Sequence, residues 1–281
     1  MKLVFHVKHT PIFAFCNQKG GVGKTTSAVN IATCLAQSGH RLLLIDLDPQ
    51  GNATSGVGED KNALPRTIYP VILGEKPLEG AIKETQIPNL WLVPSNSQLS
   101  GAEVELISLP EREFQLSKAI EPVRGQYDFI FIDCPPSLGL LTVNALSASS
   151  FIFIPLQCEY YALEGLGQLI QTYQLVKKNL NPGLELAGVL LTMADFRTNL
   201  TEQVIREIRE YFKEKVFSTI IPRSVRLSEA PSFGKPGVTY DPLSRGAKCY
   251  QEVAREFLER FHVKPATPEE EEIMAKEEEM K

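Results

Sequence analysis

The stretch PIFAFCNQKGGVGKTT, residues 11–26, decides the fold of this 281-residue chain. It opens with the apolar run PIFAFC, which is typical of a short strand, and continues into a glycine-rich loop that carries Gly-Lys-Thr. Beyond the loop, apolar residues recur at helical spacing until Gly39, a suitable residue for a helix C-cap. A strand, such a loop and a helix in this order predict a phosphate-binding loop rather than a turn that merely connects two elements.

The chemistry of this loop depends on its glycines and its lysine. Glycines let the backbone bend so that N–H groups point at phosphate oxygens, and the positive end of the following helix faces the same anion. Lys24 is expected to pair with the β- and γ-phosphates, and Thr25 to offer its hydroxyl to Mg²⁺. A second lysine, Lys19, follows Gln18, which occupies the position that usually carries the first glycine of the loop. Two cations in one tight loop repel each other, so Lys19 requires a separate explanation.

Apolar runs of strand length alternate with helix-like segments along the rest of the chain. Continuous apolar runs suit strands that are buried on both faces of a parallel sheet. The alternation predicts an α/β fold with a single doubly wound, mostly parallel sheet flanked by helices. The expected strands cover residues 11–16, 41–48, 90–95, 127–136, 150–156 and 184–193, with 216–222 as a further candidate, and the expected helices cover residues 25–39, 162–179, 199–213 and 246–261.

Three aspartates follow apolar runs at predicted strand ends. The carboxyl ends of parallel strands face the ligand crevice of such a sheet, so these side chains are candidates for the phosphate site. Asp133, after four apolar residues, fits the carboxylate on the Mg²⁺ side, and Asp46 is expected to contact the metal through water. Asp46 and Asp48 are two residues apart and would share one face of a regular strand, so one or both could reach the γ-phosphate and its attacking water.

Composition narrows the alternatives. We expect one P-loop domain over residues 1–264 and an acidic, disordered tail over residues 265–281, which has too little apolar content to fold alone. The net charge of −5 includes seven glutamates and two lysines in that tail, so the body of the chain is neutral. No apolar run approaches the ~20 residues that span a bilayer. The five cysteines form no CxxC pair, which disfavours a zinc site or a disulfide framework.

Several motifs together resemble one family. KGGVGKTT (19–26), with its extra lysine, resembles the deviant Walker A loop of the ParA/MinD class of ATPases. Further segments resemble the Soj-type branch of ParA proteins, which partition chromosomes and plasmids, and the similarity runs from about Pro11 to His262. These segments are LLIDLDPQGNATSGVG (43–58), FIDCPPSLGLLTVNAL (131–146), IPLQCEYYALEGLGQL (154–169), LTMADFRTNL (191–200), IIPRSVRLSEAPSFGKP (220–236) and YDPLSRGAKCYQEVAREF (240–257).

The resemblance implies a Mg²⁺-dependent ATPase that converts ATP and water to ADP and phosphate. It assigns Asp48 to polarise the attacking water, with Lys19 and Lys24 as further catalytic residues. It assigns Mg²⁺ to Thr25, Asp133 and, through water, Asp46. The ATP-binding residues that it implies are Lys19, Gly20, Gly21, Val22, Gly23, Lys24, Thr25 and Thr26, with Pro222 and Ser224 against the adenine, where many relatives carry Asn in place of Ser224.

The resemblance also implies a DNA-binding surface. Arg197 and Arg226 match positions linked to non-specific DNA binding in Soj-like members. Residues 219–248 contain five basic and two acidic side chains, a local charge of +3 on a neutral body. Contacts from lysine or arginine to phosphate need no particular base, so binding to double-stranded DNA is expected to be blind to sequence and sensitive to salt. A solvated charged face remains the alternative.

Lys19 suggests how the ATPase assembles. Lys24 already serves the phosphates of its own subunit, and we hypothesise that Lys19 has no unmet anion there. It would instead reach the nucleotide of a facing subunit and act as an arginine finger does in other phosphoryl-transfer enzymes. This hypothesis predicts an ATP-dependent homodimer that binds DNA, with hydrolysis stimulated by a ParB-type centromere-binding protein. The expected location is the bacterial cytoplasm, on the nucleoid.

Two other functions fit parts of the sequence. A MinD-like positioning ATPase would need a basic amphipathic C-terminal helix at anionic lipid, but the amphipathic segment 250–262 is followed by EEEE, so no stable membrane association is expected. An electron-transfer relative such as the nitrogenase iron protein would need cluster-ligating thiols. Cys134 follows Asp133 directly, and no second thiol occupies a matching position in the sequence.

Overall fold

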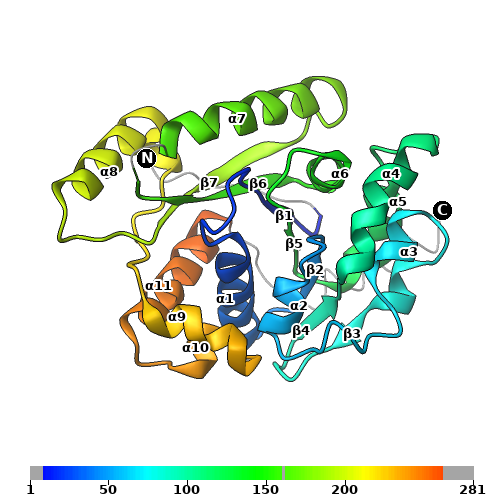
Figure 1. Ribbon diagram of the computed structural model, residues 1–281, viewed down its shortest axis with the longest axis horizontal. Helices are drawn as coiled ribbons and strands as arrows, with labels where there is room; N and C mark the ends of the chain where they lie inside the picture. Colours follow the sequence, from blue (N-terminus) through cyan, green and yellow to red (C-terminus); the bar gives the residue numbers. More distant parts are fainter. Residues whose placement is uncertain (1–8, 160–161, 262–281) are drawn as a thin grey trace, which may run out of the picture.

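The computed structural model describes residues 9–159 and 162–261, and the tail predicted from residue 265 lies outside them. Seven strands form one sheet in the order β3-β4-β2-β5-β1-β6-β7, and every neighbouring pair is parallel except β3 with β4 (Figure 1). The strands are β1 Ile12–Phe15, β2 Leu42–Asp46, β3 Lys83–Glu84, β4 Leu90–Val93, β5 Phe129–Asp133, β6 Phe151–Gln157 and β7 Glu185–Thr192. The predicted doubly wound, mostly parallel sheet is confirmed.

Helices pack on both faces of this sheet (Figure 1). The four predicted helical segments are present with ends that differ by one or two residues, as α1, α7, α8 and α11. The α-helices are α1 Lys24–Gln37, α2 Asn52–Gly56, α3 Ile68–Ile72, α4 Ala102–Glu105, α5 Gln115–Ile120, α6 Leu140–Ala148, α7 Ala162–Asn179, α8 Asn199–Phe212, α9 Val225–Glu229, α10 Gly237–Tyr240 and α11 Arg245–Arg260. None of the helices within the described residues is both long and apolar enough to cross a membrane.

The alternation of side chains along β1 divides the core into two layers. Phe13 and Phe15 pack with α1 and α11, whereas Ile12 and Ala14 face the opposite layer, which includes α5, α6, α7 and α8. Because both layers are apolar, each strand is buried on both faces, which explains why the strands read as continuous apolar runs. Phe257 of α11 lies 4.7 Å from Phe13 between ring centroids and closes one layer over the centre of the sheet.

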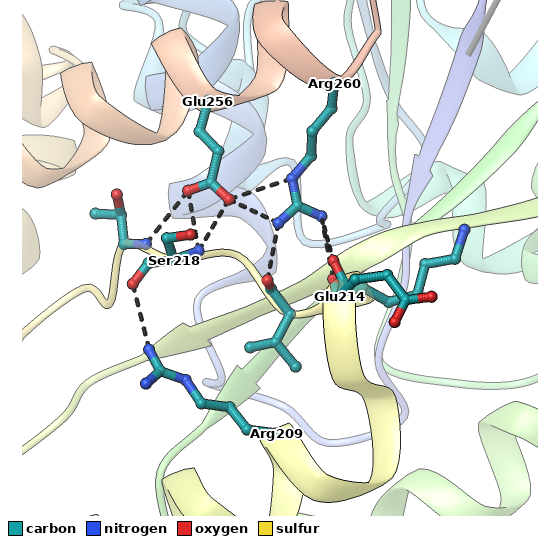
Figure 2. A network of polar contacts seen from close by, with 8 residues as sticks. Arg209, Glu214, Ser218, Glu256 and Arg260 are labelled. Atoms are coloured by element: carbon teal, nitrogen blue, oxygen red, sulfur yellow. Dashed lines mark hydrogen bonds and ion pairs between the residues drawn. The ribbon is translucent and has the colours of Figure 1, made fainter. Parts of the chain in front are cut away.

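The segment 216–222 is not the further strand that the sequence suggested. It makes only two isolated bridges, from Val216 to Val189 and from Pro222 to Ala194. Its backbone groups bind side chains of α11 instead: the Glu256 carboxylate accepts from the N–H of Ser218, as Figure 2 shows. Backbone groups that bond to side chains cannot complete a ladder, so the β-rich composition does not produce a strand here.

We call Glu256 and Arg260, together with the backbone of residues 214–219 that they bind, the α11 anchor (Figure 2). Arg260 donates to Glu256 at 2.6 Å and to the Val216 carbonyl at 2.8 Å. Its guanidinium also lies 4.1 Å from the centre of the Phe217 ring. Both charged side chains are mostly buried, with 12% of Arg260 and 17% of Glu256 exposed. The anchor therefore fixes the last helix of the domain to the segment beyond α8.

Candidate nucleotide-binding site

The predicted phosphate loop, residues 16–23, connects β1 to α1 at the carboxyl end of the sheet. Gly21 and Gly23 have φ values of 74° and 88°, a region that side chains with a Cβ rarely adopt. Gly23 is also the N-cap of α1, and its carbonyl accepts the first helical bond from the Ser27 N–H at 2.9 Å. The glycines are therefore required by the turn itself, which aims the start of α1 at the loop.

Two side chains that the sequence did not single out hold this loop in place. Asn17 donates from Nδ2 to the Pro155 carbonyl at 2.8 Å, and its Oδ1 accepts from the Lys19 N–H at 3.0 Å. Thr192, the last residue of β7, donates from Oγ1 to the Val22 carbonyl at 2.8 Å. Asn17 adjoins the motif and could have been considered, but Thr192 is 170 positions away in the sequence, and only the sheet order brings it to the loop.

The two lysines of the loop have different surroundings. Lys24 is buried, and its ammonium donates to the Lys19 carbonyl at 3.3 Å, so it points back across the loop. The Lys19 side chain is about half exposed and forms an ion pair with Glu159, just after β6. The hypothesis that Lys19 has no unmet anion in its own subunit is therefore wrong. The carboxyl end of a neighbouring strand supplies Glu159, and the sequence alone could not show that proximity.

Asp46 and Asp48 are held by hydrogen bonds to nearby backbone. Asp46 Oδ2 accepts from the N–H and the hydroxyl of Thr54 at 2.8 and 2.7 Å, and Oδ1 accepts from the Asp48 N–H at 3.2 Å. Burial raises the pKa of Asp46 to about 6, with the Thr54 bonds opposing the shift. Asp48 Oδ1 accepts from the Gln50 N–H at 2.9 Å. These bonds fix both side chains at the end of β2.

Asp133 differs from them in having no partner. It lies in register with Asp46 on one side and with Phe15, the last residue of β1, on the other. Its side chain is fully buried, and neither carboxyl oxygen has a hydrogen-bond partner within the described residues. Burial raises the pKa of Asp133 well above its ordinary value and the Asp46 charge adds to this. The Thr25 hydroxyl and the Lys24 ammonium oppose the shift, although the Thr25 geometry falls short of a complete hydrogen bond.

This arrangement suits a magnesium ion that arrives with a nucleotide. A buried carboxylate without a partner costs free energy until a cation neutralises it. Mg²⁺ prefers oxygen ligands and usually takes one or two from protein, with the rest from water and phosphate. Asp133 and the Thr25 hydroxyl offer such oxygens, and no cluster of three or more His, Cys, Asp or Glu side chains within the described residues provides a fuller metal cage.

The two residues assigned to the adenine lie beyond the bridge from Pro222 to Ala194. Ser224 is the N-cap of α9, and its hydroxyl accepts from the Leu227 N–H at 3.5 Å. A Cβ added to Gly246 would lie 3.0 Å from the same hydroxyl, so the helix start is tightly packed. The Ser224 hydroxyl thus has a structural role in this conformation, and its contact with adenine stays a prediction.

The two arginines assigned to DNA are exposed, and both are paired with carboxylates of their own chain. Arg197 follows β7 and donates from Nε and Nη2 to Asp195 at 2.7 and 2.6 Å. Arg226 lies in α9 and pairs with Glu229 at 3.1 Å and with Asp241 at 3.4 Å. The sequence count of positive charge in residues 219–248 did not include Asp195, which reaches this surface from another part of the chain.

Comparison with known proteins adds an independent line of support. A family described as "AAA domain" matches residues 10–186. The sporulation initiation inhibitor protein Soj of Bacillus subtilis (strain 168) is 56% identical over 245 residues, which cover 87% of this chain and 97% of that protein. The chromosome partitioning protein ParA of Myxococcus xanthus (strain DK1622) is 53% identical over 249 residues, covering 89% of this chain and 88% of that protein.

Solved structures show the same fold. A putative plasmid partition protein of Borrelia burgdorferi bound to AMPPNP matches with a TM-score of 0.78 and 26% identity, over 90% of this chain and all of that one. Cobyrinic acid a,c-diamide synthase of Mycobacterium smegmatis with bound ADP and magnesium matches with a TM-score of 0.77 and 37% identity, over 88% of this chain and 93% of that one. Both proteins hold an adenine nucleotide on this fold.

Proposed function

The chain belongs to the ParA/Soj family of chromosome-partitioning ATPases, and from this premise we propose that it works as a nucleotide switch on DNA. ATP closes two subunits face to face, and the dimer binds double-stranded DNA without regard to sequence. A ParB-type centromere-binding protein stimulates hydrolysis, and the ADP form releases the DNA. The ATPase domain spans residues 1–264, residues 265–281 form an acidic tail, and the protein acts in the cytoplasm on the nucleoid.

The observation that carries this proposal is the buried, unpartnered carboxylate of Asp133 beside the phosphate loop. Magnesium bound with ATP would neutralise this carboxylate and the charge that develops on the phosphates. Thr25 and Asp133 would hold the ion, Asp46 would orient its water, and Lys24 would leave the Lys19 carbonyl for the β- and γ-phosphates. Asp48 would orient the attacking water, and Pro222 and Ser224 would border the adenine.

Lys19 supports dimerisation in a revised form. Its ion pair with Glu159 is half exposed, so it competes with water and is worth little free energy. When a second subunit brings its nucleotide close, the phosphates would offer Lys19 more negative charge than a single carboxylate does. Lys19 would then exchange Glu159 for the phosphates of the facing subunit, which makes ATP a bond between the subunits.

The packing of α11 favours this function over a MinD-like membrane switch. Tyr250, Val253 and Phe257, which form the apolar side of the amphipathic helix, are at most 1% exposed against the sheet and α1. A helix whose apolar side is already buried has none left to insert into lipid. Sedimentation with anionic liposomes tests this directly, since ATP-dependent pelleting of the protein would favour the membrane function.

The decisive experiment measures binding of random-sequence duplex DNA with ATP and with ADP, for the wild type and for Asp48→Ala. We expect tight binding only with ATP, and we expect the mutant to bind ATP and DNA but to stall before hydrolysis. Equal affinity in the two nucleotide states would contradict the switch, because a ligand that binds both states equally shifts no population.

A matched experiment tests the role of Lys19. Lys19→Ala should retain nucleotide binding in the monomer, weaken the ATP dimer and lose stimulated hydrolysis, since the substitution removes the charge that acts across the interface. Sedimentation velocity with ATP and phosphate release with partner protein and DNA measure the two effects. A Lys19→Ala protein with normal stimulated turnover would refute the role across the interface.

A further inference from the structure

Four arginines and three carboxylates share one surface near the carboxyl end of β7. The Arg223 N–H donates to the Ala194 carbonyl at 3.1 Å, so the segment before α9 lies against the loop that follows β7. Figure 1 shows α9 and α10 side by side, next to the start of α11. We call this the arginine surface, and its charged members are Asp195, Arg197, Arg223, Arg226, Glu229, Asp241 and Arg245.

Two of these arginines are neutralised within the chain. Asp195 binds the Arg197 guanidinium through two hydrogen bonds and also accepts from its backbone N–H at 3.2 Å. Arg226 lies between two carboxylates, Glu229 and Asp241. The two arginines that the family resemblance assigns to DNA therefore carry no net charge toward an approaching duplex while these pairs persist.

The other two arginines have no carboxylate bound to them within the described residues. The Arg245 guanidinium lies 5.6 Å from the centre of the exposed Phe196 ring, a contact that leaves its charge uncompensated. Arg223 is exposed and contributes only a long-range interaction with Asp195, whose pKa is lowered to about 2 mainly by its bonds to Arg197. The positive charge that DNA would meet first thus comes from Arg223 and Arg245.

We propose that Asp195, Glu229 and Asp241 compete with DNA phosphate for Arg197 and Arg226, while Arg223 and Arg245 make the first contacts. The inference rests on the proposed function, because it concerns how the DNA surface is regulated. In one subunit, each paired arginine must leave its carboxylate before it can bind phosphate, which weakens binding. Two linked subunits present two copies of Arg223 and Arg245 to one duplex, so the dimer tolerates this loss and the single subunit does not.

The strength of the pairs suits such a competition. An exposed ion pair contributes up to about 1 kcal/mol, which corresponds to about a fivefold change in affinity. Phosphate offers arginine the same two-oxygen geometry that a carboxylate does, so the exchange preserves the hydrogen bonds of the guanidinium. Each carboxylate therefore lowers DNA affinity by a few-fold without preventing binding.

The experiment measures the affinity of the full chain for random-sequence duplex DNA, with ATP and with ADP. The variants are Asp195→Asn and Glu229→Gln, which remove charge while keeping the shape of the side chain. Asp128→Asn is the matched control: Asp128 binds both the guanidinium and the backbone N–H of Arg41, as Asp195 does for Arg197, but at the amino end of the sheet. Arg223→Ala provides the opposite change.

We expect Asp195→Asn and Glu229→Gln each to bind DNA about fivefold more tightly with ADP and to narrow the difference between ADP and ATP. Asp128→Asn should match the wild type, and Arg223→Ala should weaken binding and reduce the slope of log affinity against log salt by ~0.9. Wild-type affinity for Asp195→Asn and Glu229→Gln, or an equal gain for Asp128→Asn, would overturn the inference alone. No duplex binding by the wild type in ATP would instead refute the proposed function.

Discussion

Asp133 and Glu256 are both buried carboxylates, and the protein treats them in opposite ways. Glu256 accepts hydrogen bonds from two backbone N–H groups and from Arg260, so its charge is fully compensated. Asp133 has no hydrogen-bond partner in the described residues and stands in register with a second acid, Asp46. A compensated network holds two parts of a fold together, whereas an uncompensated group stores an unfavourable free energy that a ligand can relieve. The contrast separates a structural site from a binding site.

Removal of Arg260 should produce the largest effect on stability. Arg260→Ala leaves Glu256 without its cation and exposes the ring of Phe217, and we expect a loss of ~3–4 kcal/mol in the free energy of unfolding. Arg260→Lys should recover part of this, because lysine keeps the charge but not the planar fork. Urea denaturation measures both. A loss below that of Arg41→Ala, which breaks an exposed pair, would contradict the structural role of the anchor.

The pH dependence of stability should show the second effect. A carboxyl whose pKa is raised on folding stabilises the protein fully below its unfolded pKa, and this contribution is lost as pH rises through the folded pKa. For Asp46 the window lies between its ordinary value of 3.8 and about 6, which corresponds to a loss of up to ~3 kcal/mol. Asp133 extends the same trend upward. Thermal unfolding without nucleotide should therefore weaken from pH 4 to 6, and Asp46→Asn should flatten the curve.

Asp133→Asn should reverse the usual relation between activity and stability. It removes a buried charge without a partner, so we expect the nucleotide-free protein to gain ~1–3 kcal/mol. It also removes a proposed magnesium ligand, so ATP hydrolysis should fall at least ~100-fold. Thermal shifts with and without Mg²⁺ and ADP measure this contrast, since the ligand should stabilise the wild type much more than the variant. A less stable variant that keeps its activity would remove the distinction between the two carboxylates.

Glu159→Gln should have the smallest effect and sharpens the comparison at its exposed limit. The substitution releases Lys19 from its pair, and we expect the ATP dimer to tighten by up to about fivefold while affinity for ADP in the monomer stays the same. Sedimentation equilibrium with ATP provides the measurement. Glu113→Gln, which releases Arg112 from a pair of similar exposure, is the control. An unchanged dimer in Glu159→Gln would mean that the pair does not oppose assembly.

The sequence predicted the sheet well and the pairings poorly. The apolar runs identified the strands of the parallel sheet, because burial on both faces leaves a continuous signal, and Gly-Lys-Thr located the phosphate loop between β1 and α1. The run at 216–222 was misleading, since its backbone bonds to Glu256 and Arg260 rather than to a strand. The short edge strand Lys83–Glu84 has no apolar residue and left no signal.

By itself, the sequence determined that a phosphate loop starts a parallel sheet and that aspartates end its neighbouring strands, since both features are local patterns along the chain. Only the tertiary structure decided which side chains meet. It paired Lys19 with Glu159, Arg197 with Asp195 and Thr192 with the loop, and it left Asp133 without a partner. The physical reason is that partners come from the ends of strands and loops far apart in sequence, so whether a charge is compensated depends on the order of strands in the sheet.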